Sequence, residues 1–264
     1  LENEERAAAT IEKYRRALLN FAAFLSGAAV TPETIRLWKD ELHERNYAPS
    51  TINTFLAALN GFFLFCGWSD CRARFLKIQH RLFRNSRQEL TRAEYERLVA
   101  AAETAGDRSL ALLMETICST GIRVSEVQYI TVEAAKNGKA EIALKGKIRT
   151  ILLPSKLCRK LLKFAARQKT ASGAIFRAKS GNAMSRYQIW SKMKKLCERA
   201  GVDAEKVFPH NLRHLFATAF YRAYKDIVKL ADVLGHSSIE TTRIYLVTSA
   251  AEHRRQLERL HLVS

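Results

Sequence analysis

Apolar residues recur every three or four positions over roughly the first eighty residues, a spacing that predicts amphipathic helices. Thr31 and Pro32 mark one helix start, because threonine caps a first turn and proline suits the first helical position. Gly67 marks one end, since glycine readily adopts the backbone conformation that stops a helix. The expected helices are about Glu4–Leu25, one from Thr31 onward and one from Pro49 to Gly67. This part of the chain is therefore predicted to be all-helical.

A polar, basic stretch without apolar periodicity, His80–Gln88, interrupts this pattern. Thr91 and Glu94 then have the spacing of a capping box, in which two side chains satisfy backbone N–H groups at a helix start. Further helices are expected over about 92–102 and 108–118. We therefore predict a helical domain over 1–82, a linker over 83–90 and a second domain over 91–264.

Strand character is concentrated between Ile130 and Leu153. Asn137-Gly138 is typical of a hairpin turn, and apolar residues alternate with others on both sides of Lys145-Gly146-Lys147. A small antiparallel sheet is expected, with Lys145 at a hairpin tip. Helical patterns resume from Ser155 to the end. The predicted fold class is mainly α with a small antiparallel β-sheet, an α+β arrangement.

Charge narrows the choice of partner. Lysine and arginine outnumber aspartate and glutamate by 44 to 26, which gives a net charge of +18. Such an excess favours an extended polyanion, and nucleic acid is the leading candidate. A membrane partner is not expected, because no apolar run reaches the roughly 18 to 20 residues of a spanning helix and no signal peptide is visible. We therefore expect a cytoplasmic, nucleoid-associated protein.

Two other chemistries are weakly suggested and set aside. His210 and His214 have the four-residue spacing of zinc ligands in one metalloprotease motif, but Asn211 occupies the position where that motif needs glutamate. Cys66 and Arg72 have the spacing of a tyrosine phosphatase loop without its glycine-rich phosphate cradle. We expect neither a metal nor any other cofactor.

One set of side chains carries the chemistry for metal-free phosphodiester cleavage. Arginines neutralise a phosphate, lysine and histidine place or move protons, and a tyrosine can attack phosphorus. Taken singly, a surface arginine or a half-buried tyrosine is unremarkable. The candidates are Arg123, Lys145, His210, Arg213, His236 and Tyr245.

The order and spacing of these residues resemble the tyrosine recombinase or integrase family, especially its Xer-like branch. The motifs are Thr120–Glu126, His210-x-x-Arg213, Leu234-Gly235-His236 and the terminal Tyr245. Residues 31–67 resemble the helical core-binding domain of the same family. The resemblance thus implies a helical core-binding domain followed by a tyrosine recombinase catalytic domain.

The resemblance also implies a role for each residue. Arg123 and Arg213 would hold the non-bridging oxygens of the scissile phosphate, and Lys145 would protonate the departing 5′-oxygen. His210 would help protonate or position the phosphate, and His236 would hydrogen-bond it. Tyr245 would attack and form a 3′-phosphotyrosyl enzyme. Glu126 would brace the site by accepting hydrogen bonds from its neighbours.

Contacts to DNA outside this cluster are expected on two helices. The helix starting near Ser185 corresponds to a family segment that lies in a major groove, although a solvated basic face is a competing interpretation. The helix start near Ser50 could bind phosphates or simply cap itself. The candidates are Arg186, Gln188, Lys192, Lys195, Ser50, Thr51, Asn53 and Thr54.

By resemblance, the working unit is a homotetramer on double-stranded recombination sites, monomeric or dimeric when free, with accessory DNA-bending proteins as possible partners. The tail Ser249–Ser264 would pack on a neighbouring protomer or fold back on its own domain. The sequence after Tyr245 differs from the usual Xer continuation, which favours a mobile-element integrase. The alternatives are a chromosome-dimer-resolving Xer recombinase, a type IB topoisomerase, or a DNA-binding regulator that has lost the chemistry.

Overall fold

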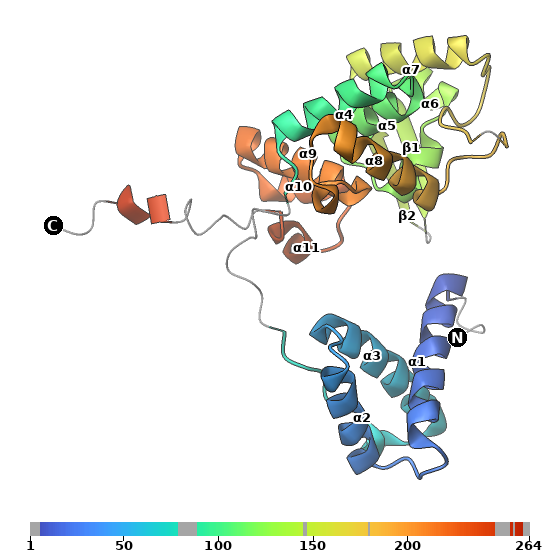
Figure 1. The fold of residues 1–264 in the computed structure, drawn as a ribbon, viewed down its shortest axis with the longest axis vertical. Helices are drawn as coiled ribbons and strands as arrows, with labels where there is room; N and C mark the ends of the chain where they lie inside the picture. Colours follow the sequence, from blue (N-terminus) through green and yellow to red (C-terminus); the bar gives the residue numbers. More distant parts are fainter. Residues whose placement is uncertain are drawn as a thin grey trace. The chain divides into compact units, whose positions relative to one another are not determined.

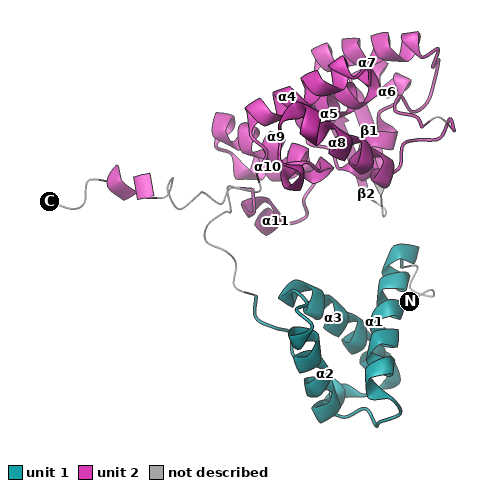
Figure 2. Cartoon of the chain, viewed as in Figure 1, with its two compact units in different colours: residues 1–81 teal, residues 82–264 magenta. Residues whose placement is uncertain are grey.

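The computed structural model describes residues 6–78, 89–144, 147–178, 180–245, 254–255 and 257–260. The chain forms two compact units, Leu1–Arg81 and Leu82–Ser264 (Figure 2). Most of the stretch expected as a linker, 83–88, lies outside the described residues, as do Lys145 and most of the tail. Each unit is described by itself.

Unit 1 is a small helical domain (Figure 1). Thr31 caps the second helix, as its sequence predicts, and Thr34 completes a capping box with it. The first helix begins at Ala8, later than the expected Glu4, and no side chain caps it. Trp38 lies at the centre of the core, with its ring 4.9 Å from that of Phe21. The elements are α1 (Ala8–Leu25), α2 (Pro32–Glu44), α3 (Pro49–Cys66) and a 3-10 turn, η1 (Ser69–Cys71).

The third helix of unit 1, α3, is long and apolar enough by length and composition to cross a membrane, with a mean hydropathy of 1.2. Two of its polar side chains instead hold the chain segment that follows η1. Asn53 exchanges hydrogen bonds of 2.9 and 2.7 Å with the backbone of Leu76, and Asn60 exchanges bonds of 2.9 and 2.8 Å with Ala73. We therefore describe α3 as the core helix of unit 1.

Unit 2 is mainly helical and carries one two-stranded antiparallel sheet (Figure 1). The predicted fold class, mainly α with a small antiparallel sheet, is confirmed. The elements are α4 (Arg92–Thr104), α5 (Arg108–Thr120), η3 (Val124–Tyr129), α6 (Val132–Asn137), β1 (Lys139–Leu144), β2 (Lys147–Leu152), α7 (Ser155–Arg167), α8 (Arg186–Ala200), η4 (Ala204–Lys206), α9 (Pro209–Tyr224), α10 (Ile227–Leu234) and α11 (Ile239–Arg243).

The sheet differs from its prediction in one respect. Asn137-Gly138 does not form a hairpin turn but ends the short helix α6, with Gly138 at φ +68°. Both structures need a left-handed backbone, so the same dipeptide suits either. The strands pair from Lys139 opposite Leu152 to Leu144 opposite Lys147.

Helix α5 runs through the core of unit 2 and ends where the candidate site begins. It packs against α4, α7 and α9, and most of its side chains are buried. Gly121 ends it at φ +67°, and a Cβ added there would lie 2.4 Å from Cδ1 of Phe216 on α9. This close approach lets the backbone after α5 pass against α9, and it places Arg123 near the start of that helix.

Candidate active site

Arg213, in the second turn of α9, lies at the centre of the site and is fully buried. Its guanidinium donates hydrogen bonds to the carbonyl of Gly121 after α5 and, at 2.7 Å, to the carbonyl of Leu234 at the end of α10. A third bond of 2.8 Å joins its Nη2 to Nε2 of His236. One side chain on α9 therefore holds the turn after α5 and the segment 234–236, which are far apart in the sequence.

His236 is held in one tautomer by its two neighbours. Because the guanidinium of Arg213 can only donate, Nε2 of His236 accepts, and Nδ1 donates to Oγ1 of Thr242 at 2.8 Å. Burial, together with the nearby positive charges of Arg213 and Arg123, lowers the pKa of His236 to about 4. The imidazole is therefore neutral near neutral pH.

Tyr245 points into the same cluster and is only 3% exposed. Its ring stacks on that of His236, with centroids 5.8 Å apart, and meets the ring of His214 edge to face at 5.0 Å. The phenolic oxygen lies 3.5 Å from Nε2 of His210. Burial, followed by the charges of Arg213 and Arg123, lowers the pKa of His210, so its Nε2 can accept a proton.

Arg123 is the guanidinium of the site that remains open to solvent. It follows the turn at Gly121 and its side chain is 41% exposed. Its Nη1 donates to Glu126 at 2.9 Å, its backbone N–H donates to the same carboxylate at 2.8 Å, and its Nη2 reaches the carbonyl of Gly235 at 3.3 Å. The buried Glu126 thus fixes both the backbone and the side chain of Arg123.

Arg149 on β2 is a member of the site that the sequence reasoning missed. Its Nη1 donates to Glu126 at 3.2 Å and its Nη2 to the carbonyl of Val233 at 2.7 Å. Burial lowers its pKa to about 10, with Glu126 opposing that shift, so the group stays charged near neutral pH. One signal could have revealed it: Arg149 lies two residues before the buried Ile151, on the face of the strand where alternation calls for an apolar side chain.

The site opens into a cavity of about 660 Å³ in unit 2. Arg123, His210 and Arg213 line it on one side, and α8 lines it on the other with Arg186, Tyr187 and Trp190. The structure therefore brings together Arg123, Glu126, His210, Arg213, His236 and Tyr245 from the predicted set. Lys145 lies outside the described residues.

The candidate DNA contacts on α8 differ in whether their side chains are exposed or already bonded within the protein. Arg186 is exposed and lines the cavity, and Lys195 is exposed. The carbonyl oxygen of the Gln188 side chain accepts the backbone N–H of Ser185 at 2.8 Å, and Lys192 pairs with Asp107 at 2.7 Å. Both of these side chains already have partners within the protein.

The candidate DNA contacts in unit 1 also include both bonded and exposed side chains. Both polar atoms of Asn53 are bonded to Leu76, which directs that amide toward its own unit. Thr54 donates its hydroxyl to the carbonyl of Ser50 at 2.9 Å. Ser50 and Thr54 are exposed at the start of α3, whereas Thr51 is half-buried.

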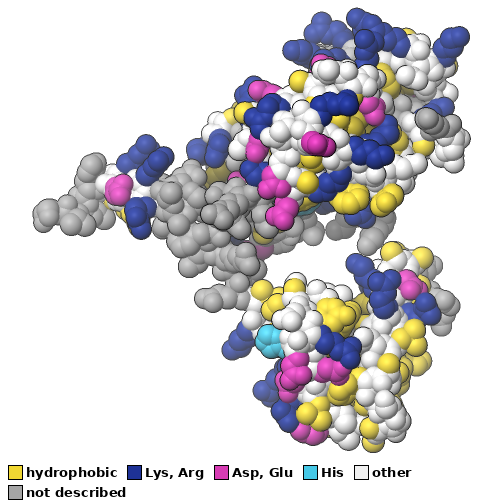
Figure 3. Space-filling view, viewed as in Figure 1, with side chains coloured by type: hydrophobic (Ala, Val, Ile, Leu, Met, Phe, Trp, Pro, Cys, Tyr) yellow, Lys and Arg dark blue, Asp and Glu magenta, His cyan; other side chains and the backbone are white. Residues whose placement is uncertain are grey.

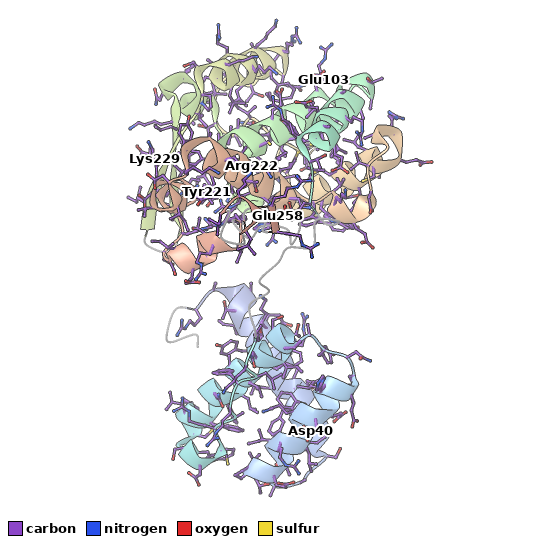
Figure 4. All side chains as sticks on the ribbon, turned by 90° about the vertical axis from the view of Figure 1, so that its left-hand side faces the viewer. Asp40, Glu103, Tyr221, Arg222, Lys229 and Glu258 are labelled. Carbon is purple, nitrogen blue, oxygen red and sulfur yellow. The ribbon has the colours of Figure 1, made fainter. Side chains whose placement is uncertain are left out.

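Basic side chains form several separate groups on the visible surface of unit 2, with fewer acidic side chains between them (Figure 3). Lys229 on α10 and Arg222 on α9 are exposed, and Figure 4 shows Lys229 at the edge of the unit, pointing outward. With a net charge of +18, this surface suits a polyanion that reaches the cavity.

Two family models match the chain. The model described as the phage integrase family matches residues 88–252, and the N-terminal SAM-like domain of phage integrases matches residues 1–69. Among curated relatives, the tyrosine recombinase XerA of Pyrococcus furiosus is 30% identical over 100% of this chain and 92% of its own length. XerD of Brucella melitensis is 33% identical over 91% of this chain and 88% of its own length.

Solved structures share the fold. The XerH recombinase bound to its difH substrate has a TM-score of 0.72 at 21% identity and covers 93% of this chain and 78% of its own. The Tn1549 transposon integrase in complex with transposon right-end DNA has a TM-score of 0.75 at 17% identity, over 97% of this chain and 94% of its own. From the family models and the full-length relatives, the chain belongs to the phage integrase family and is a tyrosine site-specific recombinase.

Proposed function

We propose that the chain cleaves and rejoins DNA through a 3′-phosphotyrosyl intermediate on Tyr245. The observation that carries this assignment is the convergence of a phenol, two histidines and two guanidiniums from separate segments in one cluster, of which Arg123, His210 and Arg213 line the cavity. Cations gathered where negative charge grows on phosphorus stabilise the transition state most when they are fixed in advance. The hydrogen bonds of Arg213 to the carbonyls of Gly121 and Leu234 fix it in this way.

The first step forms a bond between the phenolic oxygen of Tyr245 and phosphorus and breaks the bond from phosphorus to the 5′-oxygen. His210 is placed to take the phenolic proton, because its Nε2 is 3.5 Å from that oxygen and its lowered pKa leaves the ring unprotonated before the reaction. Such contacts are often long before substrate binds. Lys145 is the proposed proton donor to the 5′-oxygen. In the second step, the 5′-hydroxyl of a partner strand displaces Tyr245, which takes its proton back.

Arg123 and Arg213 are proposed to contact the phosphate in different ways, because one is open to solvent and the other is buried. Arg123 is the open group, so it is the proposed first contact of a non-bridging oxygen. Arg213 is buried within the site and is the proposed second contact. His236 is proposed to hydrogen-bond the phosphate as a neutral ring rather than to act as an acid, since its pKa is about 4. Glu126 keeps Arg123 in place from behind.

We propose an integrase of a mobile element as the biological role, acting in the cytoplasm on double-stranded sites as a homotetramer, with accessory DNA-bending proteins as possible partners. The likeness in fold to the Tn1549 transposon integrase supports it. Chromosome-dimer resolution is the alternative, and the full-length match to XerA favours that role. In either role, unit 1 and unit 2 would close around the duplex as a clamp, and the tail Ser249–Ser264 would pack on a neighbouring protomer.

The test begins with a pool of duplexes whose central sequence is random. Each duplex carries a nick, so that a cleaved strand cannot be rejoined. Wild-type protein is expected to give a covalent complex that survives denaturation, and sequencing the trapped DNA would supply the recombination site. Tyr245→Phe is expected to give none. A covalent complex of equal yield with Tyr245→Phe would overturn the assignment. Junctions recovered in vivo at a circular element or at a chromosome site would separate the two biological roles.

A further inference from the structure

Two large aromatic side chains line the part of the cavity that the proposed chemistry leaves unused. Tyr187 and Trp190 project from the first turns of α8, three positions apart and so on one face of the helix. Tyr187 is 72% exposed and Trp190 is 41% exposed. Their ring centroids are 5.9 Å apart with a tilt of 32°. Together they form one apolar surface that faces the same space as Arg123 and His210.

This aromatic surface, defined as the rings of Tyr187 and Trp190, is held on a rigid support. The Ser185 capping box fixes the start of α8, and the buried Ile189 and Met193 anchor the helix to the core. Lys194 places its Nζ 5.6 Å from the Trp190 ring, which adds a cation–π contact one turn further along. The backbone that carries both rings is thus fixed before any ligand arrives.

The cavity is larger than a phosphate alone would fill. Pockets of roughly 300 to 1,000 Å³ take ligands of many heavy atoms. At about 660 Å³, the cavity leaves space beside a phosphate held by Arg123 and Arg213, and Tyr187 and Trp190 line that space. What lies next to a phosphate in a duplex is a deoxyribose, which exposes its carbon atoms, and a base, which exposes its edge in the groove.

We propose that Tyr187 and Trp190 pack against the sugar and base of one nucleotide next to the scissile phosphate. This inference rests on the proposed function and extends it with a binding subsite. Contact with an aromatic face accepts any base, so the subsite would position the phosphate for Tyr245 without selecting a sequence. The two residues touch substrate but take no part in proton transfer.

The experiment combines changes in the full-length protein with changes in the DNA. The substrate is the nicked duplex recovered by trapping, intact or with an abasic residue at each of the three positions on either side of the scissile phosphate. The protein variants are Trp190→Ala, Tyr187→Ala and Trp190→Phe. Tyr224→Ala is the matched control, because Tyr224 is 65% exposed at the end of α9 and does not line the cavity. The readout is the rate of covalent complex formation.

Loss of one aromatic contact is expected to slow the wild-type rate about 5- to 100-fold. One abasic position should show this loss, and Trp190→Ala should show a similar loss on intact DNA. Both changes together should cost little more than either alone, since they remove the same contact. Trp190→Phe should retain most of the rate, and Tyr224→Ala all of it. Equal rates at every abasic position, or losses that multiply, would overturn the subsite.

Failure of the proposed function gives a different result. If wild-type protein forms no covalent complex on any duplex, the assignment of Tyr245 fails, and the subsite is then tested by binding alone. Tyr245→Phe protein with and without Trp190→Ala is titrated with random-sequence duplex DNA at one fixed salt concentration. Weaker binding by the doubly substituted protein supports the subsite, whereas equal binding overturns it.

Discussion

Arg149 on β2 donates from one nitrogen to both carboxylate oxygens of Glu126, at 3.2 and 3.3 Å, where almost no solvent reaches. The same carboxylate holds Arg123, and the same guanidinium holds the carbonyl of Val233 two residues before Gly235. Glu126 and Arg149 therefore connect the hairpin strand, the turn after α5 and the segment that carries His236. Two predictions concern this pair.

Glu126→Gln keeps the shape of the side chain and removes its charge. Three guanidiniums, those of Arg123, Arg149 and Arg213, would then lie close together without a carboxylate. Removing one partner of a buried ion pair leaves the other uncompensated, so we expect the free energy of unfolding to fall by about 3 kcal/mol. Urea denaturation measures this. The control is Glu96→Gln, whose pair with Arg92 is exposed and should contribute less than about 1 kcal/mol. Equal losses in the two variants would contradict the account.

Arg149→Lys keeps the charge and loses the forked contact to Glu126 and Val233. A misplacement of the groups around Arg123 and His236 should slow covalent complex formation about 10- to 100-fold. Affinity for random-sequence duplex DNA should change by less than about twofold, because the hydrogen bonds of Arg149 go to the protein groups Glu126 and Val233. Arg159→Lys, on the exposed face of α7, serves as the control. A loss confined to DNA affinity would show that Arg149 contacts substrate instead.

Acid should destabilise the protein through His236. Its pKa is about 4 in the folded protein and near 6.5 in an unfolded chain, so the unfolded state binds a proton first as pH falls. The stabilisation is complete above about pH 6.5 and is lost as pH approaches about 4. Allowing for solvent screening, we expect His236 to account for about 1 kcal/mol between about pH 7 and pH 5. His236→Gln should reduce the slope of unfolding free energy against pH in this range, as measured by urea denaturation at several pH values. An unchanged slope would show that His236 is not the group that titrates.

Gly121 and Gly138 offer a matched pair, because both have nearly the same backbone angle, φ +67° and +68°. An alanine at Gly138 meets nothing within 4 Å, so only the left-handed backbone penalty of about 1 kcal/mol applies. At Gly121, the added Cβ would lie 2.4 Å from the Phe216 ring. We expect Gly121→Ala to cost about 2 to 4 kcal/mol of unfolding free energy and to slow cleavage as well. Equal costs at both positions would show that the Phe216 ring moves freely.

The sequence was most informative where order and spacing matched a family, and least where one local signal fits two structures. The motifs predicted which residues converge, and Arg213 and His236 do meet at 2.8 Å. Asn137-Gly138 was misassigned because a helix end and a hairpin turn need the same backbone conformation. Lys192 has a tertiary partner, Asp107, eighty-five residues away.

Arg149 is a residue of the site that the sequence analysis did not predict. Strand alternation indicates that Arg149 faces inward with Ile151, but only the folded arrangement supplies its partners, Glu126 and Val233. Side-chain partners brought together from distant segments are properties of the assembled fold. They could not be assigned from spacing alone.

The balance of charge around Glu126 also bears on how the empty enzyme behaves. One carboxylate faces the guanidiniums of Arg123, Arg149 and Arg213, and the remaining acceptors around them include backbone carbonyls that carry no formal charge. Mutual repulsion among the cations is therefore only partly cancelled before substrate enters. A phosphodiester supplies the missing anion. Binding it relieves the repulsion among the three guanidiniums, and this relief adds to the affinity for the backbone of the duplex. The ligand-free protein gives up some stability, and a bound strand restores it.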